Sequence, residues 1–199
     1  GEKYTNTRVI SYGCGGRFPE APHIYRIWNK YYLLLAEGGT EYAHSVTIQR
    51  SEHPYGPYEE APGNPILTNR NDSDNDIQCT GHGDLVEDVS GRWWMVCLGV
   101  RVPKYKDEQI MLHHLGRETF LAPVCWKKDG WPCAGIDGRI YKEMEGDLPG
   151  PAPAARTDSF YADFHAPKLQ MEFNYLRNPV FKNYQPDAIV VVAFGQIIP

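Results

Sequence analysis

A recurring hairpin pattern restricts the fold of this sequence more than any other feature. In each occurrence a short strand-like segment is followed by a turn and then by a segment rich in aromatic and apolar residues. The pattern occurs at His23–Trp28 with Tyr31–Ala36, at Gly83–Glu87 with Arg92–Leu98, and at Phe120–Trp126 before Trp131; a further strand is predicted at Ser45–Arg50. Such short antiparallel units predict an all-β protein, and they fit propeller blades as well as a β-sandwich.

The charge and hydropathy of the chain argue against two classes of partner. The 199 residues carry a formal net charge of −5 and show no basic stripe that could neutralise phosphates, so we expect no nucleic-acid partner. The most apolar segment, Ile189–Phe194, has the length of a strand. A membrane span needs roughly 18–20 apolar residues, so we expect no membrane partner either.

The composition changes near residue 147. A proline-rich stretch that cannot supply sheet hydrogen bonds predicts a linker over residues 147–164. Strands are predicted beyond it at Met171–Phe173 and Ile189–Phe194, but residues 165–199 are too few to enclose an independent core. We therefore expect residues 1–146 to be part of one domain and residues 165–199 to begin a second, truncated all-β domain. Such a chain is expected to be part of a longer one and not to fold alone.

The cysteines and the acidic stretch give no metal motif. The five cysteines show no CxxC spacing, which excludes a zinc knuckle or a thioredoxin motif. Cys125 and Cys133 flank a predicted hairpin turn, and whether they form a disulfide depends on geometry. The stretch Asp72–Asp76 lacks the glycine and the terminal Glu of a calcium loop, so it is predicted to be a solvated loop.

One carboxylate stands between two prolines, in the segment Pro19–Glu20–Ala21–Pro22–His23. The prolines fix the backbone and remove donors, which aims Glu20 as proton transfer requires. Three more motifs follow in order: Ala-Glu-Gly-Gly-Thr-Glu-Tyr from Ala36, Thr-Gly-His-Gly-Asp from Thr80, and His-Leu-Gly-Arg-Glu-Thr-Phe-Leu from His114. Together these motifs resemble glycoside hydrolase family 43, in its β-xylosidase and α-L-arabinofuranosidase branch.

The resemblance implies a fold. Members of this family are five-bladed β-propellers with a sugar pocket at one end of the axis, and in this branch a β-sandwich packs behind the propeller. We therefore expect the last three blades of a five-bladed β-propeller, followed by the start of a β-sandwich domain. The remaining N-terminal blades of the same protein are the expected partner. We also expect a secreted, extracellular protein, a context in which the triplet Asn71–Asp72–Ser73 could be glycosylated.

The resemblance also implies a reaction. It is the inverting hydrolysis of terminal xylose or arabinose from oligosaccharides derived from xylan or arabinoxylan. Glu20 corresponds to the general acid, which protonates the leaving glycosidic oxygen. The general base and an Asp that tunes the acid are expected before residue 1, and neither Asp84 nor Asp163 is assigned to these roles. The choice between xylose and arabinose stays open.

Three further residues are implied to line the sugar pocket. Arg117 corresponds to an arginine whose planar donors suit vicinal hydroxyls. His82 corresponds to a histidine near the propeller axis, which in some members lies close to a calcium ion through water. Thr40 belongs to a glycine-rich loop that allows close approach to a ligand. No protein metal ligand and no required cofactor is expected, and calcium near His82 is left open.

Two residues depart from the family pattern. Ala21 stands where Gly is usual beside the acid, and Gly83 stands where Ala is usual after the histidine. Both exchanges are small, and we expect catalysis to be unaffected. Because no base is assigned in these residues, the alternative hypothesis is a carbohydrate-binding propeller without catalysis.

Overall fold

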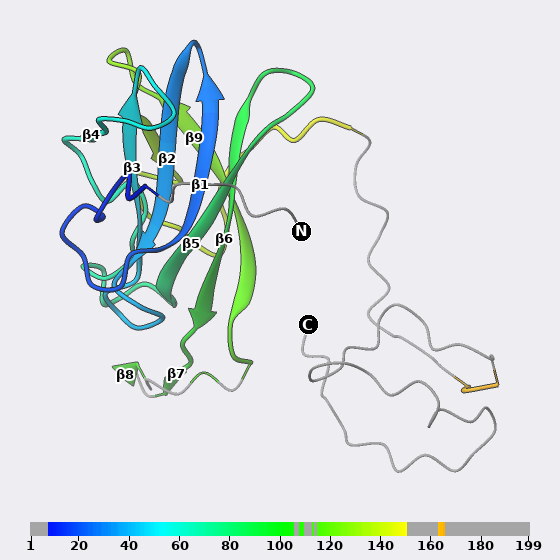
Figure 1. Ribbon diagram of the computed structural model, residues 1–199. Helices are drawn as coiled ribbons and strands as arrows, with labels where there is room; N and C mark the ends of the chain where they lie inside the picture. Colours follow the sequence, from blue (N-terminus) through cyan, green and yellow to red (C-terminus); the bar gives the residue numbers. More distant parts are fainter. Residues whose placement is uncertain (1–7, 106–107, 110–112, 114, 151–162, 166–199) are drawn as a thin grey trace. The chain divides into compact units, whose positions relative to one another are not determined.

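The computed structural model describes residues 8–105, 108–109, 113, 115–150 and 163–165 (Figure 1). Every secondary-structure element assigned within these residues is a β-strand, which confirms the all-β prediction. The strands are β1 (Glu20–Ile27), β2 (Lys30–Glu37), β3 (Ser45–Ser51), β4 (Glu59–Glu60), β5 (Ile77–Glu87), β6 (Trp93–Arg101), β7 (Lys104–Tyr105), β8 (Glu108–Gln109), β9 (Glu118–Trp126) and β10 (Pro132–Ala134). They form two four-stranded antiparallel sheets and a short two-stranded one.

The first sheet has the strand order β1-β2-β3-β4. Trp28 and Asn29 close its first hairpin, and both have the positive φ values that a tight two-residue turn requires. Strand β2 lies inside the sheet and is buried on both faces from Tyr32 to Glu37. Burial on both faces explains why the run Leu33–Leu35 is apolar without interruption.

The second sheet has the order β10-β9-β6-β5. In β6 the side chains alternate between its faces, so that Met95 and Cys97 are buried whereas Val96 is exposed. Cys125 of β9 and Cys133 of β10 are register partners across their hairpin. Both thiols are free, so the disulfide left open by the sequence is not formed.

The core lies between the two sheets, because β2 and β3 both contact β5 (Figure 1). Val46, Ile48 and Met95 are fully buried there. Sheets stacked through their faces are the arrangement of neighbouring propeller blades. The number of blades in the whole protein stays a prediction.

Strands β1 and β5 are linked through Tyr25 and Asp84. The Tyr25 hydroxyl donates a hydrogen bond to the Asp84 carboxylate and accepts one from the backbone N–H of Leu85 at 3.0 Å. The imidazole of His23 lies 3.8 Å from the same carboxylate. Asp84 therefore joins the two sheets, and these contacts account for it without a catalytic role.

Gly83 marks a close approach between the sheets. A Cβ atom at this position would lie 2.9 Å from Sδ of Met95 and 3.1 Å from Cγ2 of Val46. Glycine at position 83, where alanine is usual in the family, therefore leaves room for the side chains of Met95 and Val46. An alanine here requires Met95 or Val46 to shift.

The predicted hairpins are confirmed, but one strand boundary was wrong and one predicted loop is solvated only in part. Strand β5 begins at Ile77 instead of Gly83, because its pairing with β6 shifts on both sides of Gly81 and breaks the regular alternation. The predicted solvated loop contains the buried Asn75, whose amide donates to the carbonyl of Ile140 at 2.9 Å. Local polarity cannot reveal a partner so distant in the sequence.

The chain divides into two units, Gly1–Pro149 and Gly150–Pro199. The domain boundaries predicted at residues 146 and 164 stay predictions. The strands predicted at residues 171–173 and 189–194 lie outside the described residues. Within the described part of the chain, no helix is long and apolar enough to cross a membrane.

Candidate active site

Glu20 is the first residue of β1, and the backbone around it is irregular. Phe18 and Ala21 have positive φ values of 54° and 47°, and the pairing of β1 with β2 shifts between Glu20 and His23. Irregular pairing of this kind re-aims a side chain and is common beside active sites. Glu20 is exposed, so its carboxylate is accessible to a ligand.

A second irregular strand positions His82. Cys79 and His82 in β5 have positive φ values of 54° and 52°, one on each side of Gly81. A left-handed conformation costs a residue other than glycine roughly 1–2 kcal/mol, so it persists where the surrounding structure fixes it. Strained residues thus flank Glu20 in the first sheet and include His82 in the second. Backbone strain of this kind is common at functional sites.

His44 completes a cluster with Glu20 and His82, and sequence reasoning missed it. Its ring is fully buried, and its Nδ1 lies 2.9 Å from the carbonyl oxygen of Cys79. Its Nε2 is buried without a hydrogen-bond partner among the described residues. One polar side-chain atom from each of Glu20, His44 and His82 lies within 4.8 Å of the other two. A histidine directly after the glycine-rich loop, at the head of a strand, was the available signal.

The protonation state of His44 follows from its surroundings. Burial lowers its pKa, and the charges of His82 and Arg117 lower it further, against the opposing effects of the Cys79 carbonyl and of Glu20. His44 is therefore neutral near pH 7. Because a carbonyl oxygen only accepts hydrogen bonds, the ring proton is assigned to Nδ1 and the lone pair to Nε2. The effect of Arg117 also brings this arginine into the electrostatic surroundings of the cluster.

Arg117 is exposed and directly precedes β9. Its neighbour Glu118 accepts two hydrogen bonds from the guanidinium of Arg101 in β6, at 2.8 and 2.6 Å. This bidentate pair fixes the start of β9 against the end of β6 and thereby limits where Arg117 can lie. The contact of Arg117 with a sugar stays a prediction.

Thr40 is exposed in the loop between β2 and β3. Two backbone hydrogen bonds close this loop, from the N–H of Glu41 to the carbonyl of Gly39 at 2.8 Å and from the N–H of His44 to the carbonyl of Glu41 at 2.9 Å. The loop that carries Thr40 therefore also delivers His44 to the cluster. The contact of Thr40 with a sugar stays a prediction.

Phe18 is a second residue that sequence reasoning missed. Its side chain is 64% exposed although it lies two residues before Glu20. Its ring packs on the glycine-rich loop, since a Cβ atom at Gly39 would lie 3.4 Å from it. The guanidinium carbon of Arg17 lies 5.4 Å from the centroid of this ring. An exposed aromatic ring can pack against the apolar face of a sugar. The signal was an aromatic residue two positions before a proline-flanked acid.

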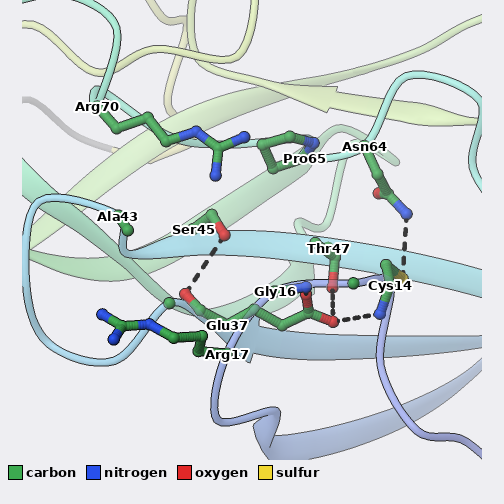
Figure 2. Close-up of a pocket in the computed structure, with 12 residues that line it drawn as sticks. Cys14, Gly16, Arg17, Glu37, Ala43, Ser45, Thr47, Asn64, Pro65 and Arg70 are labelled. Carbon is green, nitrogen blue, oxygen red and sulfur yellow. Dashed lines mark hydrogen bonds between the residues drawn. The ribbon is translucent and has the colours of Figure 1, made fainter.

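Glu37 anchors the segment that leads to Glu20 (Figure 2). Its buried carboxylate accepts hydrogen bonds from the backbone N–H groups of Cys14 and Gly16 and from the hydroxyl of Thr47, the latter two at 2.7 and 3.2 Å. A Cβ atom at Gly13 would lie 2.6 Å from the same carboxylate, so glycine fits this close approach. The pocket of about 360 Å³ drawn in Figure 2 surrounds Glu37, and none of the cluster residues line it.

The donor set of the cluster does not by itself suit calcium. It offers two imidazole nitrogens and one carboxylate oxygen, whereas calcium takes about six to eight oxygen ligands. A calcium ion held near His82 through water stays a prediction. The geometry fits a carboxyl group next to a hydrogen-bond acceptor.

The positive φ of Ala21 leads to a prediction about stability. The left-handed conformation costs alanine roughly 1–2 kcal/mol, whereas glycine loses roughly 0.5–1 kcal/mol more entropy on folding. We expect Ala21→Gly to raise the free energy of unfolding of the full-length protein by about 0.5 kcal/mol, without loss of activity. Thermal melting measures the change. Ala36→Gly is the matched control, because Ala36 lies opposite Glu20 in the regular strand β2. This second variant should lower the free energy of unfolding. Equal losses in both variants would show that Ala21 is not strained.

Stacked blade-like sheets with a carboxylate and two histidines gathered from both of them define a β-propeller protein with a carboxylate-centred site. The chain belongs to glycosyl hydrolases family 43, whose family profile matches residues 2–132. This confirms the family that the motifs indicate.

Its relatives are named as glycosidases. The chain is 44% identical over 173 residues to a non-reducing end α-L-arabinofuranosidase of Bacteroides ovatus, covering 86% of this chain and 31% of that protein. It is 38% identical over 182 residues to a β-xylosidase of Bacillus subtilis, covering 86% of this chain and 33% of that protein. The chain thus spans about a third of the length of these curated relatives.

Solved structures show the same similarity. A family 43 protein from the xyloglucan utilisation locus of Bacteroides ovatus aligns with a TM-score of 0.75 at 44% identity, covering 88% of this chain and 34% of that one. A family 43 protein of Bacillus licheniformis aligns with a TM-score of 0.72 at 40% identity, covering 87% and 32%.

Proposed function

We propose that the protein carrying this chain is an inverting glycosidase. It removes terminal xylose or arabinose from oligosaccharides derived from xylan or arabinoxylan. The observation that carries the proposal is the cluster of Glu20, His44 and His82, in which an accessible carboxylate is held by strained backbone next to two imidazoles. The names of the relatives, an arabinofuranosidase and a β-xylosidase, support a pentose as the sugar released.

In the proposed reaction Glu20 is the general acid. It donates its proton to the glycosidic oxygen as the bond to the anomeric carbon breaks, so the leaving group departs as an alcohol. A water molecule attacks the opposite face of the sugar and is deprotonated by a second carboxylate, about 6.5–9.5 Å from the acid in inverting enzymes. No residue of this chain is assigned to that second carboxylate.

Three side chains are proposed to hold the sugar beside Glu20. The planar donors of Arg117 suit two neighbouring hydroxyl groups, and His82 can hydrogen-bond a third. The exposed ring of Phe18 gives an apolar surface for the leaving portion of the substrate. Thr40 borders the site from the loop between β2 and β3.

The stereochemistry of the product tests this proposal. The full-length protein is incubated with 4-nitrophenyl β-D-xyloside and, separately, with 4-nitrophenyl α-L-arabinofuranoside, and proton NMR records the anomeric signals at early times. The sugar formed first from a turned-over substrate should have the opposite anomeric configuration, for example α-xylose from the β-xyloside. A product formed with retained configuration would overturn the inverting mechanism.

The alternative is a carbohydrate-binding propeller without catalysis. It is motivated by the single carboxylate that the described residues contribute to the cluster. Calorimetric titration with xylo- and arabino-oligosaccharides separates the two functions. Binding of these sugars without any turnover would support the alternative and reject the hydrolase.

A further inference from the structure

We propose that His44 is a positioning residue for the acid: the lone pair on its Nε2 accepts a hydrogen bond from the protonated carboxyl of Glu20 and holds that proton in place between turnovers. The inference rests on the proposed function of Glu20. No proton is transferred to His44. Glu20 gives its proton to the leaving oxygen, and the proton lost by the attacking water restores the acid through solvent.

The geometry of His44 suits a fixed acceptor. Its ring is held by the contact of Nδ1 with the Cys79 carbonyl at 2.9 Å, and its own carbonyl accepts a hydrogen bond from the hydroxyl of Thr68 at 2.8 Å. The ring also packs tightly on Gly81, where a Cβ atom would lie 2.5 Å from Cδ2 of His44. The ring is fixed by the Cys79 carbonyl and by Gly81, and the Thr68 bond fixes the backbone that carries it, so Nε2 keeps its direction.

Nε2 of His44 is the ring nitrogen that has no hydrogen-bond partner within the described part of the chain. Nε2 is buried without a hydrogen bond among the described residues, and leaving such an atom unsatisfied costs about 1–3 kcal/mol. Among the His, Cys, Asp and Glu side chains of the described residues, Glu20 and His82 each bring one polar atom within 4.8 Å of a ring nitrogen of His44. Both are exposed at the protein surface, so each can move by the short distance that a hydrogen bond to Nε2 requires.

The surrounding charges favour this arrangement over an ion pair. His82, Arg117 and Glu20 are the titratable groups that act on His44, and burial together with the first two keeps it neutral. A neutral acceptor stabilises the protonated form of a neighbouring carboxyl, whereas a charged imidazolium would stabilise the carboxylate. The neutral state of His44 is thus the one that keeps an acid ready to donate.

Two variants separate this role from a merely structural one. In His44→Gln the side-chain amide reaches the place of Nε2 and can still accept from Glu20. In His44→Asn the amide reaches only the place of Nδ1, so it can keep the bond to the Cys79 carbonyl but offers nothing to Glu20. If His44 served only to hold Cys79, the Asn variant would be the better tolerated of the two.

The assay compares leaving groups in the full-length protein. A xylobiose or arabinosyl oligosaccharide needs the acid, whereas a 2,4-dinitrophenyl glycoside departs without a proton. Because a displacement of about 1 Å at a reacting group can cost about 100-fold, we expect His44→Asn to lower kcat about 100-fold on the oligosaccharide and less than about 5-fold on the activated glycoside. His44→Gln should recover most of the loss. The basic limb of the pH profile should move to lower pH in His44→Asn, because the protonated acid has lost its acceptor.

The outcomes distinguish this inference from the function on which it rests. Unchanged activity of Glu20→Gln would reject the proposed function itself. If Glu20→Gln is inactive but His44→Asn slows both substrates equally, or is better tolerated than His44→Gln, the positioning role is overturned. In the Glu20→Gln background, adding His44→Asn should cause no further loss on the oligosaccharide.

A measurement on the unaltered His44 covers the case in which its variants do not fold. Nitrogen-15 NMR of labelled histidines reports whether the lone pair of Nε2 accepts a hydrogen bond. The His44 signal is assigned by correlation with the backbone resonances of its own residue. Its Nε2 shift should change on Glu20→Ala, and an unchanged shift would overturn the proposal.

Discussion

Replacing Glu20 by Gln is expected to slow the hydrolysis of a pentosyl oligosaccharide by orders of magnitude while the protein stays folded. Gln has nearly the same shape as Glu but no acidic proton, and general acid catalysis contributes about 10²–10⁴-fold to such a reaction. We therefore expect kcat to fall by about 10²–10⁴-fold on the oligosaccharide, measured by release of the free sugar.

Two controls make this result specific. On a 2,4-dinitrophenyl glycoside the Glu20→Gln variant should keep much of its activity, because that leaving group departs without protonation. Glu60→Gln removes another exposed negative charge, in β4, and should leave both rates unchanged. Full activity of Glu20→Gln on the oligosaccharide would remove Glu20 from the mechanism, and an equal loss on both substrates would assign it a different role.

Replacing Glu37 by Ala is expected to cause the largest loss of stability. Its buried carboxylate accepts two backbone N–H groups and the Thr47 hydroxyl, and all three donors would lose their partner. Thr47 is buried, whereas Cys14 is half-buried and Gly16 is exposed, so their N–H groups can bind water instead. A buried donor left unsatisfied costs about 1–3 kcal/mol, and we expect a loss of about that size. The segment from Cys14 to Gly16 would be released, and with it the approach to Glu20, so activity should fall as well.

Urea unfolding of the full-length protein, followed by tryptophan fluorescence, measures this effect. Glu37→Gln should lose less, because its amide oxygen still accepts from one of the two N–H groups. The matched control is Glu41→Gln in the loop that follows β2, whose ion pair with Arg17 is exposed on both sides. Exposed pairs of this kind contribute about 0–1 kcal/mol. If the Glu37 and Glu41 variants melt alike, Glu37 is not the anchor that its contacts indicate.

The hairpins were predictable from the sequence because their signals are local. The alternation of apolar residues and the turn at Asp88–Gly91 determine where β5 ends and β6 begins, and both were predicted close to their observed ends. The start of β5 was missed, since the residues around Gly81 leave the regular pairing to form the site. Irregular strand pairing of this kind interrupts the alternation of apolar and polar residues from which strands are predicted.

Two residues of the cluster were predicted from local sequence motifs, and the third was not. Glu20 and His82 stand in motifs whose spacing resembles a known family, so they could be named before any fold was known. His44 could not, because its importance comes from Cys79, which is 35 positions away in the sequence, and from Gly81, whose missing side chain makes room for the ring. Phe18 was missed because exposure of an aromatic residue cannot be read from a sequence.

The sequence by itself determined the all-β class, the order of the hairpins and the family, and it places one carboxylate, Glu20, between two prolines. The tertiary structure alone decided which histidine is buried beside that acid, which carboxylate anchors the loop before it, and which side chains the glycines accommodate. The physical reason is that strands and turns arise from neighbouring residues, whereas burial, protonation and hydrogen bonding at a site depend on groups that meet only when two sheets pack together.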